Sequence, residues 1–249
     1  MLSFEQLLNS EFIKNSDVSA VNVRSSSEIH VGESAIAVGN PKAEGISASK
    51  GIISRDSEEI TISIDGSSSV EMRVMRIDTP VNSGNSGGGL FDSKGNLIGI
   101  VNAKFSDTSV ENIGYAIPSD IVSAVSDNIL YYCDGVSCTT LQRPLLGITV
   151  TLKDSYAEYD EESGYVNIIE TTTVYEVSST SVAYGILEAN DIIKSVTIRD
   201  KTTDITRQFL LIDSILNAYV GDTITLVIER NGELLEKSFT VTQNMITSY

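Results

Sequence analysis

A glycine-rich pentapeptide, Gly84-Asn85-Ser86-Gly87-Gly88, constrains this chain more than any other segment. Glycine adopts backbone conformations that other residues avoid, so this segment predicts a sharp turn with exposed amides around Ser86. A serine hydroxyl becomes a good nucleophile only when a base removes its proton, and the oxyanion that forms needs fixed donors. The pentapeptide therefore indicates either a serine nucleophile in a reaction loop or a plain glycine-rich turn between strands.

Several further segments stand on both sides of the pentapeptide and bear on this choice. They are Val31-Gly32-Glu33-Ser34-Ala35-Ile36-Ala37-Val38-Gly39-Asn40-Pro41, Gly51-Ile52-Ile53-Ser54, Arg76-Ile77-Asp78-Thr79-Pro80-Val81-Asn82-Ser83, Gly89-Leu90-Phe91, Gly95-Asn96-Leu97-Ile98-Gly99-Ile100 and Ile113-Gly114-Tyr115-Ala116-Ile117-Pro118. Over about residues 23–122 this set resembles the HtrA (DegP-type) trypsin-like serine proteases. The resemblance implies an endopeptidase that acts on unfolded or misfolded proteins.

The resemblance also assigns roles to single residues. It implies that Ser86 is the nucleophile and that the oxyanion hole is formed by Gly84, Asn85 and Ser86, with the amides of Gly84 and Ser86 as donors. Asn85 stands where trypsin-like enzymes activated by propeptide cleavage carry an acid, which favours the HtrA branch. By the same resemblance, the primary specificity pocket is flanked by Asn102, Ala103 and Lys104.

Short β-branched segments alternate with turn residues between positions 33 and 118, which is typical of an all-β domain. We expect six strands, as the second barrel of a trypsin-like fold requires, at 36–38, 51–54, 60–64, 70–77, 97–103 and 113–117. Ser119 is expected to cap a helix that runs to about Tyr132. The fold class expected is mainly β: the C-terminal six-stranded barrel of a trypsin-like double-barrel protease, followed by a PDZ domain of α+β type.

The PDZ expectation comes from the last hundred residues. Leu145-Leu146-Gly147-Ile148 resembles the carboxylate-binding loop of the PDZ domains that follow HtrA proteases, and residues 181–193 resemble a further PDZ segment. A helix is expected at 206–218, and residues 221–226 and 227–232 are expected to give two strands joined at an Asn-Gly turn. A PDZ domain binds peptide C-termini by strand addition; the alternative is a degenerate PDZ domain that only packs against the protease.

The domain division expected from these segments has four parts. Residues 1–30 are a remnant or inter-barrel lead-in, 31–132 the protease barrel with its C-terminal helix, 133–142 a linker and 143–249 the PDZ domain. The family's catalytic histidine and aspartate lie in a first barrel, and neither is matched here. The only histidine, His30, is expected in a solvent-facing loop and not as the base.

The missing base leaves the function open. The chain is a fragment of a full protease, a natural protein without the first barrel, or one that needs a partner to supply the missing N-terminal half. The second functional hypothesis is a pseudoprotease that binds peptides without cleaving them. In either case the partners expected are polypeptide substrates or C-terminal peptides, and exposed apolar surface would favour a homo-oligomer.

Composition excludes other classes of function. A formal net charge of −17 over 249 residues argues against nucleic-acid binding, which needs clustered Lys and Arg. The acidic run from Asp154 to Glu162 lacks the spacing of a calcium loop and is interpreted as a solvated loop. No metal and no cofactor are expected.

The expected location of the protein follows mainly from the family resemblance. No stretch of the sequence is long and apolar enough to span a membrane, and Met1-Leu2-Ser3-Phe4-Glu5 does not read as a signal peptide. The family resemblance nevertheless implies an extracytoplasmic or membrane-associated protein. Cys133 and Cys138 are compatible with a small disulfide loop or with two free thiols.

Overall fold

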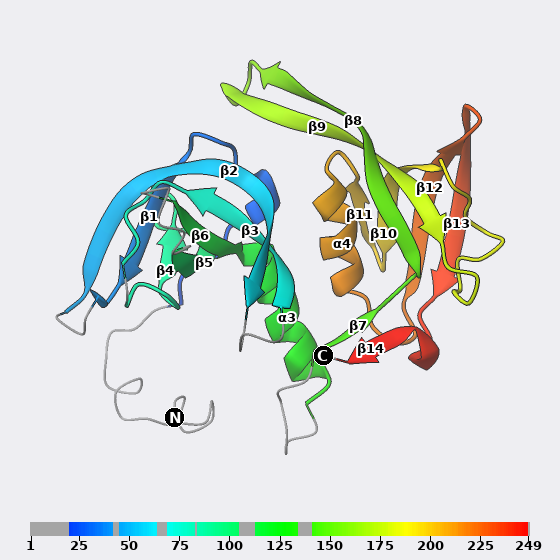
Figure 1. Cartoon of the computed structure of the whole chain (residues 1–249), viewed down its shortest axis with the longest axis horizontal. Helices are drawn as coiled ribbons and strands as arrows, with labels where there is room; N and C mark the ends of the chain where they lie inside the picture. The colour runs from blue at the N-terminus through cyan, green and yellow to red at the C-terminus, as the bar shows by residue number, and fades with distance from the viewer. Residues whose placement is uncertain are drawn as a thin grey trace.

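The computed structural model describes residues 20–41, 45–63, 69–82, 84–104, 113–133 and 141–248. These residues form two β-rich lobes, which we call the barrel lobe (residues 20–133) and the C-terminal lobe (residues 141–248) (Figure 1). The mainly β architecture expected from the sequence is confirmed. None of the helices in these ranges is long and apolar enough to cross a membrane.

Six antiparallel strands close the barrel lobe in the order β1-β2-β3-β6-β5-β4. Their bounds are β1 Ser34–Gly39, β2 Ser47–Ser63, β3 Ser69–Ile77, β4 Gly89–Phe91, β5 Leu97–Lys104 and β6 Gly114–Pro118. The number six was predicted correctly, but two of the predicted strands were wrong. Residues 51–54 and 60–63 belong to the one long strand β2, whereas Ile64 lies outside the described residues. The short strand β4 was missed.

Register shifts explain the length of β2. Its pairing with β3 shifts between Ile53 and Arg55 and again between Arg55 and Glu58. Such bulges bend a strand and increase its twist, so one strand can follow the barrel wall around a corner. Buried apolar side chains, most of them alanine, valine or isoleucine, form one core in the barrel lobe, made of Ile29, Ala35, Ala37, Ile53, Met75, Ile77, Val81, Leu90, Ile98, Val101 and Ala116.

Helix α3 (Ser119–Tyr131) follows β6 and packs against β5 and β6. The prediction that Ser119 caps this helix was wrong, because the N-cap is Pro118 and makes no side-chain cap hydrogen bond. The Ser119 hydroxyl instead donates to the carbonyl of Arg24 at 2.7 Å. The start of α3 is therefore tied to the lead-in segment, which contains the short 3-10 helix η1 (Ser26–Glu28).

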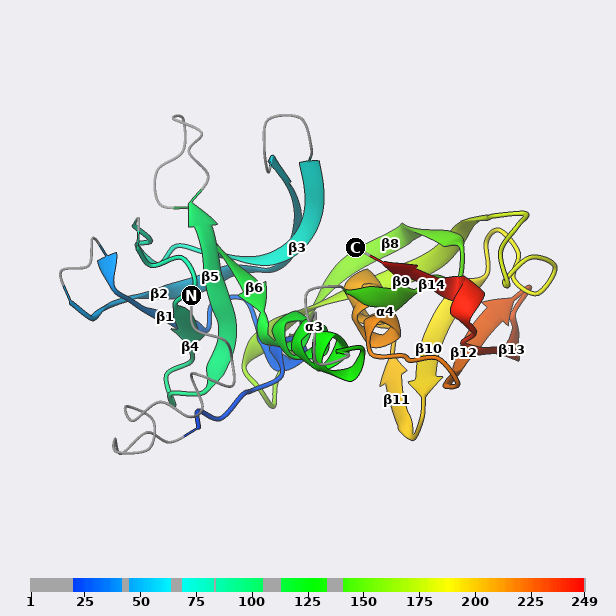
Figure 2. The same cartoon turned by 90° about the horizontal axis from the view of Figure 1, so that it is seen from below.

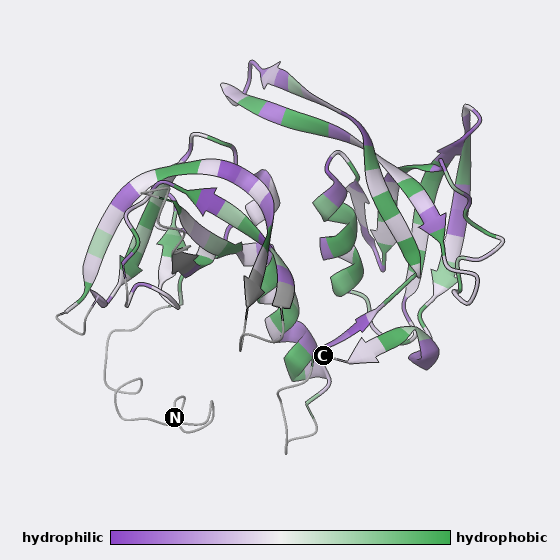
Figure 3. Cartoon of the chain, viewed as in Figure 1, coloured by the Kyte–Doolittle hydropathy of each residue, from purple (hydrophilic) through white to green (hydrophobic). Residues whose placement is uncertain are grey.

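The C-terminal lobe contains a six-stranded sheet in the order β13-β12-β10-β9-β8, with β11 on β10, and a separate pair β7–β14. Helix α4 (Gln208–Leu216) is predominantly hydrophobic (Figure 3). The strands are β7 Gln142–Pro144, β8 Ile148–Asp160, β9 Tyr165–Val177, β10 Ile192–Ile198, β11 Lys201–Asp204, β12 Thr223–Arg230, β13 Glu233–Thr240 and β14 Ile246–Ser248; η3 is Gln243–Met245.

Three expectations for this lobe can be compared with the structure. The helix expected at 206–218 is α4. The turn at Asn231 and Gly232 is confirmed, but residues 223–230 form the single strand β12 and the second strand is β13. The acidic run from Asp154 is not a loop: it forms the end of β8 and its turn into β9, in a hairpin that extends toward the barrel lobe (Figure 1).

The two lobes meet along α3 and α4, which lie next to each other (Figure 2). The ring of Tyr131 at the end of α3 stacks on Tyr219, which follows α4, with ring centroids 4.2 Å apart. Asn128 of α3 donates to the carbonyl of Gln142 at 2.6 Å. Cys133 is disulfide-bonded, and Cys138 lies outside the described residues.

Candidate active-site loop and peptide groove

Ser86 lies in the loop between β3 and β4, at one end of the barrel, and it is exposed to solvent. Gly84 and Gly87 flank it with φ angles of +101° and +84°. Residues other than glycine rarely adopt these angles, so Gly84 and Gly87 allow the backbone to turn on both sides of Ser86.

The Ser86 loop presses against the end of β1. A Cβ atom on Gly88 would lie 2.2 Å from the carbonyl oxygen of Val38, and one on Gly39 would lie 2.5 Å from Asn85 Oδ1. Both distances are shorter than non-bonded atoms can approach, so glycine is required at both positions. Asn85 is only 5% exposed, and among the described residues its Oδ1 has no hydrogen-bond partner.

The loop amides divide into two groups. Three of them donate to backbone carbonyls: Asn85 to Asn82 at 3.0 Å, Gly87 to Val101 at 2.7 Å and Gly88 to Asn85 at 2.9 Å. Among the residues that the structure describes, no backbone carbonyl accepts from the amides of Gly84 and Ser86. These two amides are the donors that the family resemblance implies for an oxyanion. Ser83 lies outside the described residues.

Strands β1 and β2 support the approach to this loop. The amide of Ile52 donates to Asp78 Oδ1 at 2.6 Å, and the hydroxyl of Ser49 donates to the carbonyl of Pro80 at 2.7 Å. The buried hydroxyl of Thr79 donates to the carbonyl of Ala35 at 3.1 Å. Residues 78–80 are thus fixed to the barrel wall.

His30 does not lie in the solvent-facing loop that was expected. Its side chain is 24% exposed, its Nδ1 lies 3.0 Å from Glu33 Oε1, and its ring stacks on Tyr165 of the C-terminal lobe, with centroids 5.0 Å apart. Burial raises the pKa of Glu33, but hydrogen bonds from Arg24 and from the amide and ring of His30 outweigh burial and lower it. Within the described ranges, no side chain hydrogen-bonds the Ser86 hydroxyl.

The residues expected at the specificity pocket lie in β5, next to the Ser86 loop. The amide of Val101 donates to the carbonyl of Gly88 at 2.8 Å, which holds β5 against the loop. Asn102 is half-buried and its Nδ2 donates to Met72 Sδ at 3.4 Å. Ala103 and Lys104 continue the strand, and their side chains lie outside the described part of the chain.

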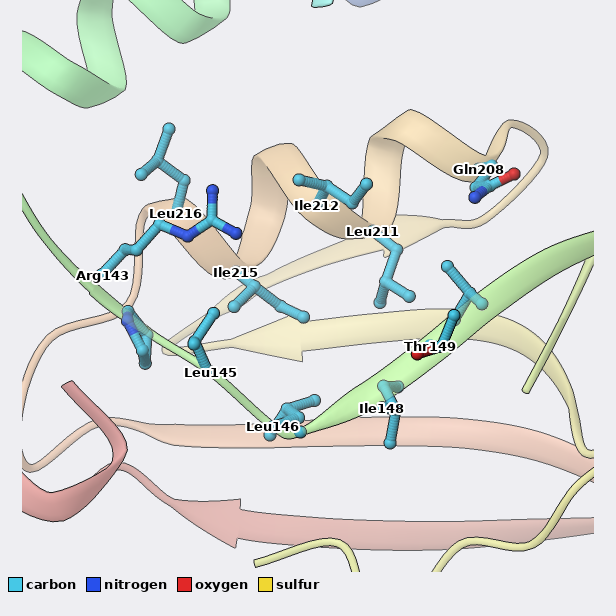
Figure 4. A pocket seen from close by; sticks show the side chains of 13 residues that line it. Arg143, Leu145, Leu146, Ile148, Thr149, Gln208, Leu211, Ile212, Ile215 and Leu216 are labelled. Atoms are coloured by element: carbon cyan, nitrogen blue, oxygen red, sulfur yellow. The ribbon is translucent and has the colours of Figure 1, made fainter. Parts of the chain in front are cut away.

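A groove of about 400 Å³ opens in the C-terminal lobe between β8 and α4 (Figure 4). The four residues singled out from the sequence, Leu145, Leu146, Gly147 and Ile148, form one end of it. Sequence reasoning missed the opposite wall, because the apolar spacing of α4 does not say which of its faces stays uncovered. That wall is formed by Gln208, Leu211, Ile212, Ile215 and Leu216.

The loop at the end of the groove has a special backbone. Gly147 has φ +69°, and a Cβ there would lie 2.3 Å from Ser181 Cβ, so only glycine fits. The amide of Leu145 donates to the carbonyl of Met245 at 2.8 Å, whereas in the described structure no backbone carbonyl accepts from the amides of Leu146 and Gly147. Leu146 is 3% exposed and anchors the loop in the core.

Strand β8 completes the groove as an edge strand. It pairs with β9 on one side and is the last strand of the sheet. An edge strand presents unpaired N–H and C=O groups to its surroundings. The groove therefore combines an open strand edge, an apolar helix face and two free amides at one end.

Comparisons with known proteins agree with the barrel. A model of the trypsin-like peptidase domain matches residues 6–100. Serine protease Do-like HtrA of Bacillus subtilis (strain 168) is 31% identical over 229 residues, covering 89% of this chain and 49% of that protein. Serine protease Do-like HtrB of the same strain is 32% identical over 240 residues, covering 90% of this chain and 48% of that protein.

A solved structure, the HtrA-type protease AlgW with tripeptide, is 26% identical with a TM-score of 0.50. The match covers 91% of this chain and 70% of that one. The chain spans about half the length of the curated relatives that it matches.

Proposed function

Because the chain is a homologue of the HtrA/Do-like trypsin-like serine proteases over about 90% of its length, we propose that it takes part in proteolytic quality control of polypeptides. In this proposal residues 31–132 are the second barrel of the protease and carry the nucleophile Ser86. Residues 133–142 are a linker, residues 143–249 are a PDZ domain that binds peptide C-termini, and residues 1–30 are a lead-in. The family resemblance extends the proposal to an extracytoplasmic or membrane-associated location.

The groove between β8 and α4 is the observation that carries the proposal. An extended peptide can add to the open edge of β8 as a further strand, which is how PDZ domains bind peptides. Its terminal carboxylate would accept hydrogen bonds from the free amides of Leu146 and Gly147. Its last side chain would enter the apolar space lined by Leu211 and Ile215. The solved structure of AlgW with tripeptide supports the coarser proposal that the chain binds peptides.

The proposed chemistry at Ser86 is acyl transfer. The hydroxyl would attack the carbonyl of a peptide bond, and the amides of Gly84 and Ser86 would stabilise the oxyanion. Asn85 would hold the loop against β1, and Asn102, Ala103 and Lys104 would flank the pocket for the substrate side chain. This reaction needs a base that takes the proton from Ser86.

The position of His30 favours a second candidate function for the chain as it stands. Its ring is engaged by Glu33 and Tyr165, and it is the only histidine in the sequence. Without a base at Ser86, only the oxyanion hole and binding would contribute to catalysis. The chain by itself would then be a pseudoprotease that binds peptides without cleaving them.

Peptide titration of the whole chain tests the proposed binding. A fluorescent peptide that ends in an apolar residue with a free carboxylate is compared with the same peptide carrying a C-terminal amide. Binding that weakens about tenfold or more on amidation, equivalent to about 1.4 kcal/mol, supports the PDZ assignment. No binding of the free acid at millimolar concentration, or equal binding of both peptides, would contradict it.

A further inference from the structure

Strand β8 continues far beyond the groove. The groove is lined by Ile148, Thr149 and Val150 at the start of the strand, and β8 then runs on to Asp160. Together with β9 it forms a projecting hairpin, which we call the hairpin arm (residues 154–171) and which extends toward the barrel lobe (Figure 1). At 3.3 Å per residue, the whole of β8 offers an edge about 40 Å long.

The outer edge of β8 stays open along the arm. β8 is the last strand of its sheet, and every residue from Thr151 to Tyr159 is exposed. Within the arm, β8 pairs one to one with β9, from Asp154 opposite Thr171 to Asp160 opposite Tyr165. This pairing uses one side of the strand, so the N–H and C=O groups on its other side are available to a further strand.

A peptide bound in the groove would follow this open edge. With its carboxylate at the amides of Leu146 and Gly147, the peptide is antiparallel to β8, so its upstream residues lie beside successively later residues of β8. Counted from Ile148 with one peptide residue for each residue of β8, the segment about 6–12 residues before the C-terminus lies beside the arm. The groove and the arm are therefore one continuous binding edge.

The side chains of the arm show which kind of polypeptide suits this edge. Because side chains alternate between the two faces of a strand, Asp154, Glu158 and Asp160 share one face of β8 with Tyr156. Two further carboxylates, those of residues 161 and 162, follow in the turn. Lys153 is the single basic residue of β8, the whole of which the structure describes. One face of the edge is thus acidic and carries an exposed aromatic ring.

We propose that the open edge of β8 along the arm binds an extended polypeptide segment that lies upstream of a bound C-terminus and carries Lys or Arg at alternate positions. The inference rests on the proposed peptide binding in the groove and adds the class of polypeptide that is bound. Main-chain pairing with the edge holds the segment. Its basic side chains lie on the acidic face, where opposite charges across a strand pair and a cation over the ring of Tyr156 are both favourable.

Charge also argues against a second copy of the chain as the occupant of this edge. The formal net charge of the chain is −17, so two copies repel each other. A basic polypeptide is attracted instead, and this attraction speeds its encounter with the arm.

Contacts at the base of the arm fix its direction. Glu170 of β9 accepts a hydrogen bond from the amide of Gln208 at 2.8 Å and pairs with Arg207. Arg207 pairs in turn with Asp56 of β2. The side chains of Glu170, Arg207 and Asp56 are only 11–13% exposed. The base of the arm is therefore tied both to α4 and to the barrel lobe.

The tip of the arm is also supported by the barrel lobe. The ring of Tyr165 stacks on His30, with centroids 5.0 Å apart, and Arg73 of β3 pairs with Asp213 to join α4 to the barrel. A two-stranded hairpin alone is only marginally stable in water. These contacts order the arm before a peptide arrives, so less conformational freedom is lost on binding.

Fluorescence anisotropy on the full chain with labelled peptides tests the proposal. A short peptide has about five residues and ends in an apolar residue with a free carboxylate; two long peptides add about ten upstream residues, with Lys at every second position in one and Gln in its place in the other. We expect the Lys peptide to bind about tenfold or more tighter than the short peptide, and the Gln peptide to bind less tightly than the Lys peptide.

Two chain variants of equal charge separate the arm from general attraction. Asp154→Asn with Glu158→Gln should remove most of the difference between the Lys and Gln peptides and leave the short peptide unchanged. Glu233→Gln with Glu236→Gln is the matched control, because these exposed residues lie on β13 at the other end of the sheet. It should leave the difference intact. An equal effect of both variants overturns the proposal, because the attraction would then not be local to the arm.

Main-chain pairing is tested with N-methyl groups on two successive upstream residues of the Lys peptide. One of two successive amides must face β8, so we expect the affinity to fall to that of the short peptide; an unchanged affinity overturns the proposal. A short peptide that binds only as the free acid, together with long peptides that bind no more tightly, overturns this inference and leaves the proposed function standing. No binding of any of the peptides contradicts both.

Discussion

The exposed hydroxyl of Ser86 lies beside two free amides, on a loop whose shape depends on glycines. The only histidine is used elsewhere, between Glu33 and Tyr165. Among the described residues, the amides of Gly84 and Ser86 thus have no backbone acceptor, and no histidine lies at Ser86 to take its proton.

The purified chain should not act as a protease on its own. We expect no turnover of casein and no labelling of Ser86 by a serine-directed phosphonate, because both need an activated hydroxyl. Labelling is measured by intact mass, with Ser86→Ala as the blank. Hydrolysis that disappears in Ser86→Ala would prove this expectation wrong and restore full enzyme status.

The second prediction concerns the packing of the Ser86 loop. Gly88→Ala would place a Cβ 2.2 Å from the carbonyl oxygen of Val38, and overpacking of this kind costs about 1–3 kcal/mol. Ser86→Ala, at an exposed position in the same loop, should change the free energy of unfolding by less than about 0.5 kcal/mol. Urea unfolding of both variants measures the difference. Equal stability would show that the loop does not pack on β1 as described.

Several features of the residues could be predicted from the sequence. The pentapeptide predicted a sharp turn around Ser86, and both glycines that flank the serine have the positive φ that the turn needs. The sequence could not predict that His30 stacks on Tyr165, because those residues are 135 positions apart (165 − 30) and no local pattern joins them. For the same reason the close approach of Gly39 to Asn85 was not foreseen.

At the scale of elements, α4 forms the groove wall that sequence reasoning missed. Ile212 lines the groove and is 40% exposed. We expect Ile212→Asp to weaken binding of a C-terminal peptide about tenfold, or about 1.4 kcal/mol, because it introduces a charge into an apolar site. Leu234→Asp is the matched control, since Leu234 is 66% exposed and lies on β13, outside the groove. Peptide affinity is measured by fluorescence anisotropy. An equal loss of affinity in both variants would argue against peptide binding in this groove.

A second element-scale prediction concerns the lead-in segment and its acid sensitivity. Arg24 pairs with Glu33 at 2.6 Å and lies 3.7 Å from Asp92. Burial raises the pKa of both carboxyl groups, but hydrogen bonds outweigh it, and both are lowered. A carboxyl group whose pKa is lowered by folding stabilises the protein at pH values above the ordinary carboxyl pKa. This contribution is lost as the pH falls below about 4.

Arg24→Gln should therefore lower the free energy of unfolding by about 1–3 kcal/mol at pH 7. Between pH 5 and pH 3 the free energy of unfolding should then fall less in this variant than in the original chain. Arg55→Gln is the control, because Arg55 is 55% exposed and only 3.9 Å from Glu58, and exposed pairs contribute less than about 1 kcal/mol. Urea unfolding at pH 7, 5 and 3 measures both. An equal loss of stability on acidification in the original chain, Arg24→Gln and Arg55→Gln would refute the role of Arg24.

Strands were easier to predict than their boundaries. β-Branched alternation located most of the barrel strands, but β2 was divided in two because its bulges interrupt the alternation at Arg55. The strand β4 has only three residues, one of them glycine, and gives no periodic signal. The acidic run was interpreted as a solvated loop because it lacks the spacing of a calcium loop, yet residues 154–160 pair with β9 as part of a strand.

At the scale of the whole molecule, the arrangement of the lobes is the part that the sequence did not predict. The ion pairs of Arg73 and Arg207 join residues that are 140 and 151 positions apart. Such contacts leave no pattern in one sequence. They attach α4, one wall of the groove, to the barrel that carries Ser86.

We propose that the C-terminal lobe binds peptide C-termini at the loop of residues 145–148. The most direct measurement is an NMR titration of the ¹⁵N-labelled chain with a peptide that ends in a free carboxylate and then with its C-terminal amide. We expect the amide signals of Leu146 and Gly147 to move on addition of the free acid and much less on addition of the C-terminal amide. Signals of β8 should move together with them. Signals at Leu146 and Gly147 that stay in place, or that move equally with both peptides, would contradict it.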